Sequence, residues 1–276
     1  MPSVMRFSTA TPAFSPKSSD RPLEAAVELR GVSKRFYYYE HRTSTLREWF
    51  IRRVLRRPLS IRRAEFTLHG FDLNVGRGEA VALLGSNGSG KSTALRLIAG
   101  IYRPSSGTIV TWGRLTAVIE LGAGFHPELT GADNVALYAA VLGLSRRELI
   151  ARYDEVVDFA QMREFMDTPL KYYSSGMEAR LAFSVAVCLQ PDILLLDEVL
   201  AVGDQEFRQR CLARLRAYHA RGGTLILVSH EADHVRELCS RAVWLEKGAV
   251  RMDGDIDQVL AAYRAHASLN RIRGAT

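Results

Sequence analysis

The sequence has little cysteine and no long apolar run, and both shortages narrow the choice of protein class. Its 276 residues contain three cysteines, Cys188, Cys211 and Cys239. An odd number of widely spaced cysteines without a C-x-x-C pair favours neither a disulfide framework nor a zinc site. Apolar runs such as 193–196 are far shorter than the ~20 residues that cross a bilayer. We therefore expect reduced, buried thiols, and any membrane span should come from a partner.

The first 24 residues also lack the features of a secretory signal. They are rich in Ser, Thr and Pro and have neither a charged n-region nor a continuous apolar h-region. We expect 1–24 to be a flexible leader, 25–266 to be one domain and 267–276 to be a short tail. Repeats of solenoid or propeller period are absent as well, which excludes those fold classes.

Positive charge is abundant but unevenly placed. The formal net charge is +7, and residues 31–63 alone carry ten Lys or Arg against two Glu. This concentration predicts a polyanionic neighbour, either nucleic acid or an acidic lipid surface. Within it, residues 45–57 can form a basic amphipathic helix with Trp49 and Phe50 on its apolar face. Such a helix is typical of a membrane interface, and the alternative is a helix packed on the protein's own core.

Short β-branched and Leu-rich runs alternate with longer helical patterns along the chain. This alternation predicts an α/β fold with parallel strands joined by crossover helices. Buried strands are predicted over 80–84, 193–197 and 225–229, an antiparallel β edge over 27–36 and 66–75, an inserted helical subdomain within 131–190 and a last helix over 256–266.

A glycine-rich loop follows the first predicted buried strand. Residues 85–93 read G-S-N-G-S-G-K-S-T, the phosphate-loop pattern, and they stand between a strand and a helix as that pattern requires. Glycines let backbone N–H groups converge on phosphate oxygens at a helix N-terminus. A glycine turn with an exposed lysine is the alternative, which this context disfavours. The predicted nucleotide contacts are Gly85, Asn87, Gly88, Gly90, Lys91, Ser92 and Thr93.

The second predicted buried strand ends in two acids, Asp197 and Glu198. At the end of a strand beside the phosphate loop, Glu198 can act as general base toward the attacking water. Asp197 and Ser92 are the predicted Mg²⁺ ligands, and Lys91 is expected to contact the β- and γ-phosphates. Many strands end in solvated acids that have no catalytic role. The assignment of Asp197 and Glu198 to an active site therefore depends on the phosphate loop at residues 85–93 being present as well.

A third motif, Tyr173-Ser174-Ser175-Gly176-Met177, precedes the acid-ended strand by about twenty residues. It resembles the signature motif L-S-G-G-Q of ATP-binding-cassette proteins, although an ordinary Ser-Gly helix cap is the alternative for this pentapeptide alone. The resemblance implies a P-loop NTPase of the ATP-binding-cassette type that hydrolyses ATP with Mg²⁺. It also implies a head-to-tail homodimer in which Ser174, Ser175 and Gly176 contact the nucleotide of the partner protomer.

Three further positions match this family. Residues 201–204 (A-V-G-D) stand where its D-loop would be, and His230 stands where its switch histidine contacts the γ-phosphate. Phe36 or Tyr37 is expected to stack on adenine. The resemblance covers residues 27–260.

The departures from the family pattern point to one subgroup. The loop after residue 117 has no glutamine, and we expect Glu120 to replace it. The segments E-L-G-A-G-F-H-P-E-L-T-G, Y-S-S-G-M and L-D-E-V-L-A-V-G-D together look like ATPase subunits that export lipid-linked polysaccharide, of O-antigen, capsule or teichoic acid type. Some members carry a C-terminal carbohydrate-binding domain, which is not expected in this shorter chain.

The subgroup implies a set of partners and a location. A polytopic permease in the inner membrane would carry the polysaccharide, and the ATPase would bind at its cytoplasmic face, close to the membrane surface. Nucleic acid is not expected as a partner. The alternatives are a cassette ATPase for another cargo such as a lipid, drug or protein, a non-transport cassette ATPase acting on nucleic acid, and an ATP-binding scaffold without catalysis.

Overall fold

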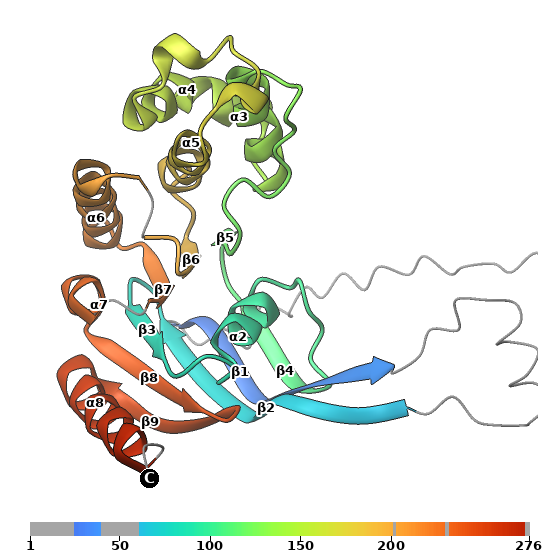
Figure 1. The fold of residues 1–276 in the computed structure, drawn as a ribbon, viewed down its shortest axis with the longest axis vertical. Coiled ribbons are helices and arrows are strands. Elements are labelled where there is room, and N and C mark those ends of the chain that lie inside the picture. The colour runs from blue at the N-terminus through green and yellow to red at the C-terminus, as the bar shows by residue number, and fades with distance from the viewer. Residues whose placement is uncertain (1–24, 40–60, 201–202, 230–231, 274–276) are drawn as a thin grey trace, which may run out of the picture.

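The computed structural model describes residues 25–39, 61–200, 203–229 and 232–273 (Figure 1). The predicted leader, the basic helix over 45–57 and His230 lie outside these residues. Within the described part of the chain, no helix is both long enough and apolar enough to cross a membrane.

The centre of the fold is a six-stranded sheet in the order β5-β6-β7-β3-β8-β9. Its first five strands are parallel, and β9 pairs antiparallel with β8. The strands are β3 (Ala80–Leu84), β5 (Leu115–Val118), β6 (Ile193–Asp197), β7 (Thr224–Val228), β8 (Arg241–Glu246) and β9 (Ala249–Asp255). The predicted strands 80–84 and 193–197 are confirmed, whereas β7 begins and ends one residue before the prediction.

Both faces of this sheet are covered, which explains the continuous apolar runs of its strands. In β3, Val81 and Leu83 join one core cluster, while Ala82 and Leu84 join a second cluster on the opposite face. The second cluster also contains most of the buried side chains of α5 (Ser175–Cys188) and α6 (Gln205–Ala220).

A smaller antiparallel sheet has the order β2-β1-β4. It consists of β1 (Ala25–Tyr39), β2 (Ile61–Gly76) and β4 (Ser106–Thr111). The predicted antiparallel edge is therefore confirmed, with both strands longer than expected. The helix α2 (Lys91–Ile98) buries Ala94 and Leu95 in one cluster with apolar side chains of β1, β2 and β3, so it is held between the two sheets.

Three helices lie at the end of the molecule away from β1 and β2 (Figure 1). They are α3 (Gly131–Val141), α4 (Arg146–Ala160) and α5, and the short 3₁₀ turns Arg163–Phe165 and Leu170–Tyr172 lie between α4 and α5. The helix α4 begins with a capping box made by Ser145 and Glu148. These helices fall within the segment where the sequence predicts a helical subdomain.

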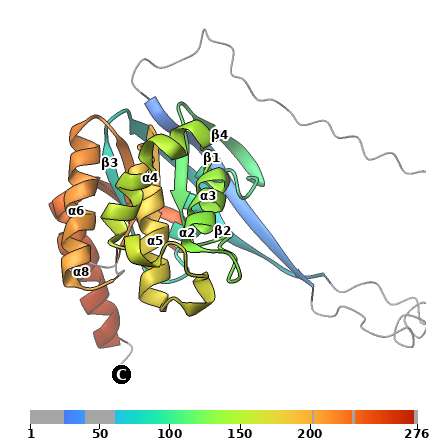
Figure 2. The same cartoon turned by 90° about the horizontal axis from the view of Figure 1, so that it is seen from above.

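The last helices are α7 (Ala232–Leu238) and α8 (Ile256–Arg273). Figure 2 shows α6 and α8 along one side of the molecule, with β1 and β2 extending toward the other. The expected end of the last helix at His266 is wrong, because α8 continues to Arg273 into the predicted tail. No Pro or Gly interrupts the segment before Gly274, so the chain has no breaker at the predicted end.

The three cysteines are free and buried, as the sequence predicts. Burial raises the pKa of Cys188, Cys211 and Cys239 to about 12 in each case. The thiols therefore stay protonated at neutral pH, which makes them poor nucleophiles and poor metal ligands.

Candidate nucleotide-binding site

The loop between β3 and α2 has a backbone that only glycine can adopt at two positions. Gly85 and Gly90 have φ angles of 150° and 107°. A Cβ atom would lie 2.4 Å from the Leu245 carbonyl oxygen at Gly85 and 2.7 Å from the Thr67 carbonyl oxygen at Gly90. Both contacts are shorter than real Cβ atoms show, so the glycines are required by close backbone packing as well as by φ.

Lys91 is the first residue of α2 and is 5% exposed. Its Nζ donates hydrogen bonds to the carbonyl oxygens of Gly85 at 2.8 Å and Ser86 at 3.1 Å. Burial lowers the pKa of Lys91, whereas the negative charges of Glu198 and Asp197 raise it. The ammonium group is thus held over the loop and interacts electrostatically with both acids, while its contact with phosphate stays a prediction.

The other loop residues differ in exposure. Asn87 and Gly88 are exposed at the turn, while Ser89 is buried and its hydroxyl has no hydrogen-bond partner within the described residues. Thr93 is half-buried on the first turn of α2. The exposed turn leaves the backbone of the loop open to a ligand.

Asp197 ends β6 and faces Ser92. The Ser92 side chain hydrogen-bonds the Asp197 carboxylate, which lowers the pKa of Asp197, but burial has the larger effect and raises that pKa. The other carboxylate oxygen, Oδ1, is buried and has no hydrogen-bond partner among the described residues. A hydroxyl and a carboxylate with an unpartnered oxygen fit Mg²⁺, which prefers few protein ligands and completes its shell with waters and phosphate oxygens.

Glu198 follows directly and has a left-handed backbone, with φ 56°. Its backbone N–H donates to the Val228 carbonyl oxygen at 2.9 Å, which ties the end of β6 to the end of β7. A non-glycine residue in this region costs free energy, and such residues concentrate at functional sites. The observed strain agrees with a constrained position for the predicted general base.

The predicted signature residues lie at the start of α5. Ser174 caps the helix by accepting a hydrogen bond from the Met177 N–H at 3.2 Å. The motif is therefore a helix cap, and a helix cap can also contact a nucleotide. Ser174 and Ser175 are exposed and Gly176 is half-buried. No described contact joins these three residues to the phosphate loop of the same chain, and their role toward a partner protomer stays a prediction.

The predicted D-loop is described only at Gly203 and Asp204. Asp204 caps α6 by accepting a hydrogen bond from the Phe207 N–H at 2.8 Å. It also forms an ion pair with Arg180 of α5. This pair joins the signature helix to the D-loop, and the sequence motifs alone did not reveal it.

The predicted adenine contacts lie on β1. The Phe36 ring packs edge-on against Tyr102 with centroids 5.3 Å apart, and the Lys34 ammonium lies 5.0 Å from the Phe36 centroid. Phe36 is half-buried, while the side chain of Tyr37 lies outside the described part of the structure. Stacking of either ring on adenine stays a prediction.

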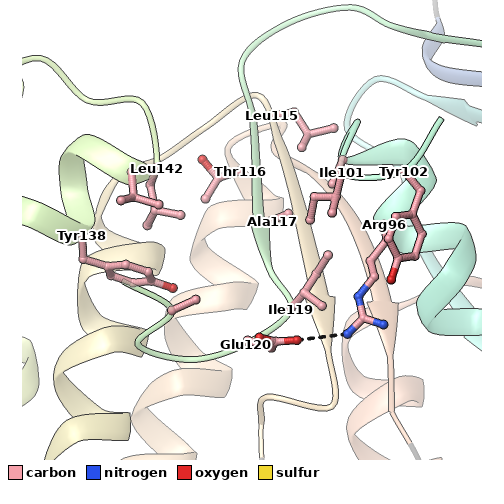
Figure 3. Close-up of a pocket in the computed structure, with 13 residues that line it drawn as sticks. Arg96, Ile101, Tyr102, Leu115, Thr116, Ala117, Ile119, Glu120, Tyr138 and Leu142 are labelled. Carbon is pink, nitrogen blue, oxygen red and sulfur yellow. Dashed lines mark hydrogen bonds and ion pairs between the residues drawn. The ribbon is translucent and has the colours of Figure 1, made fainter. Parts of the chain in front are cut away.

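Glu120 lies in the loop after β5, at a pocket of about 550 Å³ between α2, β5 and α3 (Figure 3). Its carboxylate forms an ion pair with Arg96, at 3.1 Å between Oε1 and Nη2. Sequence reasoning identified Glu120 but missed Arg96. The sequence did offer one indication of Arg96: it stands four residues after Ser92, and this spacing places Arg96 and Ser92 on one face of α2.

The continuation of this loop is held by Asn134, a residue that the sequence motifs did not single out. Its fully buried amide donates to the carbonyl oxygens of His126, Leu129 and Thr130 and accepts from the His126 N–H at 2.7 Å. The loop also contacts the segment before the signature motif, where Lys171 pairs with Glu128 at 2.7 Å. Asn134 therefore fixes the loop that joins the Glu120 region to the signature region.

Replacing Asn134 by Ala should destabilise the protein by about 1–3 kcal/mol, because a buried amide that makes several hydrogen bonds is lost. Urea unfolding followed by circular dichroism measures the change. Asn74→Ala is the matched control, since Asn74 is exposed on β2 and should change stability by less than about 0.5 kcal/mol. Equal effects of the two substitutions would show that the amide network contributes nothing.

The fold and this site define a P-loop nucleoside triphosphatase of the cassette type. A family model for ABC transporters matches residues 68–201. The chain is 40% identical over 242 residues to the O-antigen export system ATP-binding protein RfbB of Klebsiella pneumoniae, covering 88% of this chain and 98% of that protein. The chain belongs to the ATP-binding subunits of ABC transporters and is an ATP-binding ATPase.

Two further comparisons agree with this assignment. The teichoic acids export ATP-binding protein TagH of Staphylococcus epidermidis is 34% identical over 243 residues, covering 88% of this chain and 89% of that protein. The dimeric structure of a post-hydrolysis state of the ATP-binding cassette MJ0796 bound to ADP and Pi has a TM-score of 0.66 and 22% identity, and the match covers 83% of this chain. The structural likeness confirms the predicted fold class.

Proposed function

We propose that this chain is the ATP-hydrolysing subunit of an ABC transporter that exports lipid-linked polysaccharide across the cytoplasmic membrane. The observation that carries the proposal is the convergence of Lys91, Asp197 and Glu198 beside the phosphate loop. The relatives that match over nearly their whole length, named for O-antigen and teichoic acid export, support the cargo.

In this proposal the phosphates of ATP lie on the loop 85–90 and the first turn of α2. Lys91 binds the β- and γ-phosphates in place of the carbonyl oxygens that it now contacts. Glu198 accepts a proton from the attacking water, and His230 contacts the γ-phosphate. Ser92 and Asp197 would hold Mg²⁺, which supplies charge neutralisation of the phosphates when bound.

Two copies of the chain act together in this proposal. The exposed Ser174 and Ser175, with Gly176, contact the nucleotide held by the partner protomer, and Phe36 or Tyr37 stacks on adenine. ATP closes the dimer and hydrolysis opens it, so that the motion reaches a permease at the cytoplasmic face of the membrane through the loop that contains Glu120. The permease, and not this chain, carries the polysaccharide.

Deleting the gene tests the cargo. Surface polysaccharide should fall to background, and lipid-linked polysaccharide should accumulate inside the cell, because synthesis continues while export stops. The wild-type gene should restore the surface polymer, and the gene encoding Lys91→Met should not. Unchanged glycan in both places would contradict the proposed cargo and would favour a lipid, drug or protein instead.

A further inference from the structure

The hairpin turn between β8 and β9 contacts the phosphate loop, from which it is distant in the sequence. Glu246 pairs with Ala249 at the end of the hairpin, and Lys247 and Gly248 form the turn, with φ angles of 48° and 81°. Two successive residues with positive φ are the geometry of a type I′ turn. Lys247 is exposed, whereas Gly248 is buried. The neighbours of Gly248 therefore meet its backbone directly.

This hairpin meets the phosphate loop at both ends of the loop. The Gly248 N–H donates a hydrogen bond to the Ser89 carbonyl oxygen at 3.0 Å, close to the end of the loop. At the start of the loop, a Cβ atom on Gly85 would lie 2.4 Å from the Leu245 carbonyl oxygen, so the two backbones are in direct contact. One hairpin thus supports the loop where it leaves β3 and where it enters α2.

The strand β2 completes the contact between the hairpin and the loop. A Cβ atom would come within 2.7 Å of the Thr67 carbonyl oxygen at Gly90, and within 2.6 Å of the same oxygen at Gly248. The His69 N–H also donates to the Gly248 carbonyl oxygen, at 2.8 Å. Real Cβ atoms do not approach backbone oxygens so closely, so a side chain at position 248 would force β2, the turn or the loop to move.

We propose that Gly248 is a positioning residue of the nucleotide site, which holds the phosphate loop in the conformation that binds Mg²⁺–ATP. The inference rests on the proposed function, because it needs the ATP phosphates on the loop 85–90. Such a loop binds phosphate through backbone N–H groups, whose directions follow from the backbone conformation. The turn 86–88 is exposed, whereas Ser89 and Gly90 are buried. The conformation of the exposed turn therefore depends on the contacts at the two ends of the loop, which the hairpin supplies.

Gly248→Ala in the full-length protein tests this role. Binding of a fluorescent ATP analogue with Mg²⁺ should weaken about tenfold, since a misplacement of about 1 Å in a site can cost up to about 10²-fold. Gly222→Ala is the matched control, because Gly222 has a φ of 87° and no other described atom lies within 4 Å of its added Cβ. Gly222 precedes β7, at the end of the parallel sheet opposite to the phosphate loop. Gly222→Ala should bind within about twofold of wild type.

Urea unfolding separates a positioning role from a structural one. Both alanine variants should lower the urea midpoint, because each places a side chain at positive φ. A lower midpoint of Gly248→Ala without weaker binding would overturn the inference. Lys91→Met in the same assay separates the two levels: weak binding by Lys91→Met with normal binding by Gly248→Ala contradicts the inference alone, whereas normal binding by Lys91→Met contradicts the proposed phosphate site on which both depend.

Hydrogen exchange of the wild-type protein tests the same contact without relying on the folding of a variant. If the contact between Gly248 and Ser89 favours ATP binding about tenfold, nucleotide must stabilise that contact by the same factor, because coupling is reciprocal. The Gly248 amide should then exchange about tenfold more slowly with Mg²⁺ and a non-hydrolysable ATP analogue. The Gly222 amide, which donates to the His219 carbonyl oxygen at 2.8 Å, should be unaffected. Equal exchange of the Gly248 amide with and without nucleotide would refute the proposal.

Discussion

The Glu198→Gln protein is expected to bind ATP with near-normal affinity and to hydrolyse it about 10²–10⁴-fold more slowly, the range that a positioned general base contributes. The amide is nearly the same size as the carboxylate but cannot accept the proton of the attacking water. The backbone should remain in place, because the hydrogen bond to Val228 is made by the main chain of residue 198. Phosphate release measures turnover, and a fluorescent ATP analogue measures binding.

The same variant should accumulate a dimer in the presence of ATP, since the step that opens the dimer is blocked. Light scattering with ATP, and again with ADP, should show the dimer only with ATP. Glu164→Gln is the matched control, because it makes the same chemical change in an exposed 3₁₀ turn away from the site. Near-normal turnover of Glu198→Gln would remove Glu198 as the base.

Lys91→Met should weaken ATP binding about 10- to 100-fold and reduce hydrolysis below detection. The substitution removes the ammonium group that lies over the loop, and charge-assisted hydrogen bonds contribute about 1.5–3 kcal/mol each. The fold should persist, since methionine fills most of the same buried space. Equilibrium binding of the ATP analogue, with and without Mg²⁺, measures the loss.

Arg147→Met is the control for Lys91→Met, because it also removes one positive charge but from an exposed position on α4. Its binding and turnover should equal those of the wild type. A similar loss in both variants would indicate that net charge, and not the position of Lys91, governs ATP binding. Such a result would contradict the assignment of the phosphate site.

The sequence predicted those strands that can be recognised from the pattern of apolar and polar residues within a short segment. The runs that became β3 and β6 are apolar throughout because both faces of the central sheet are covered, and this can be read from the residues alone. The antiparallel pairing of β1 and β2 was also predicted. The end of α8 was misplaced, because no residue near His266 marks a stop and only packing decides how far such a helix continues.

For the site, the sequence by itself determined the phosphate loop and the acids that end β6, because each depends on a few neighbouring residues in one strand, turn or helix. Only the tertiary structure decided which distant side chains support them. Arg96 of α2 meets Glu120 in the loop after β5, and Arg180 of α5 meets Asp204 in the D-loop. These contacts join residues from separate elements, and their formation depends on how the helices pack against the sheet, which no local pattern records.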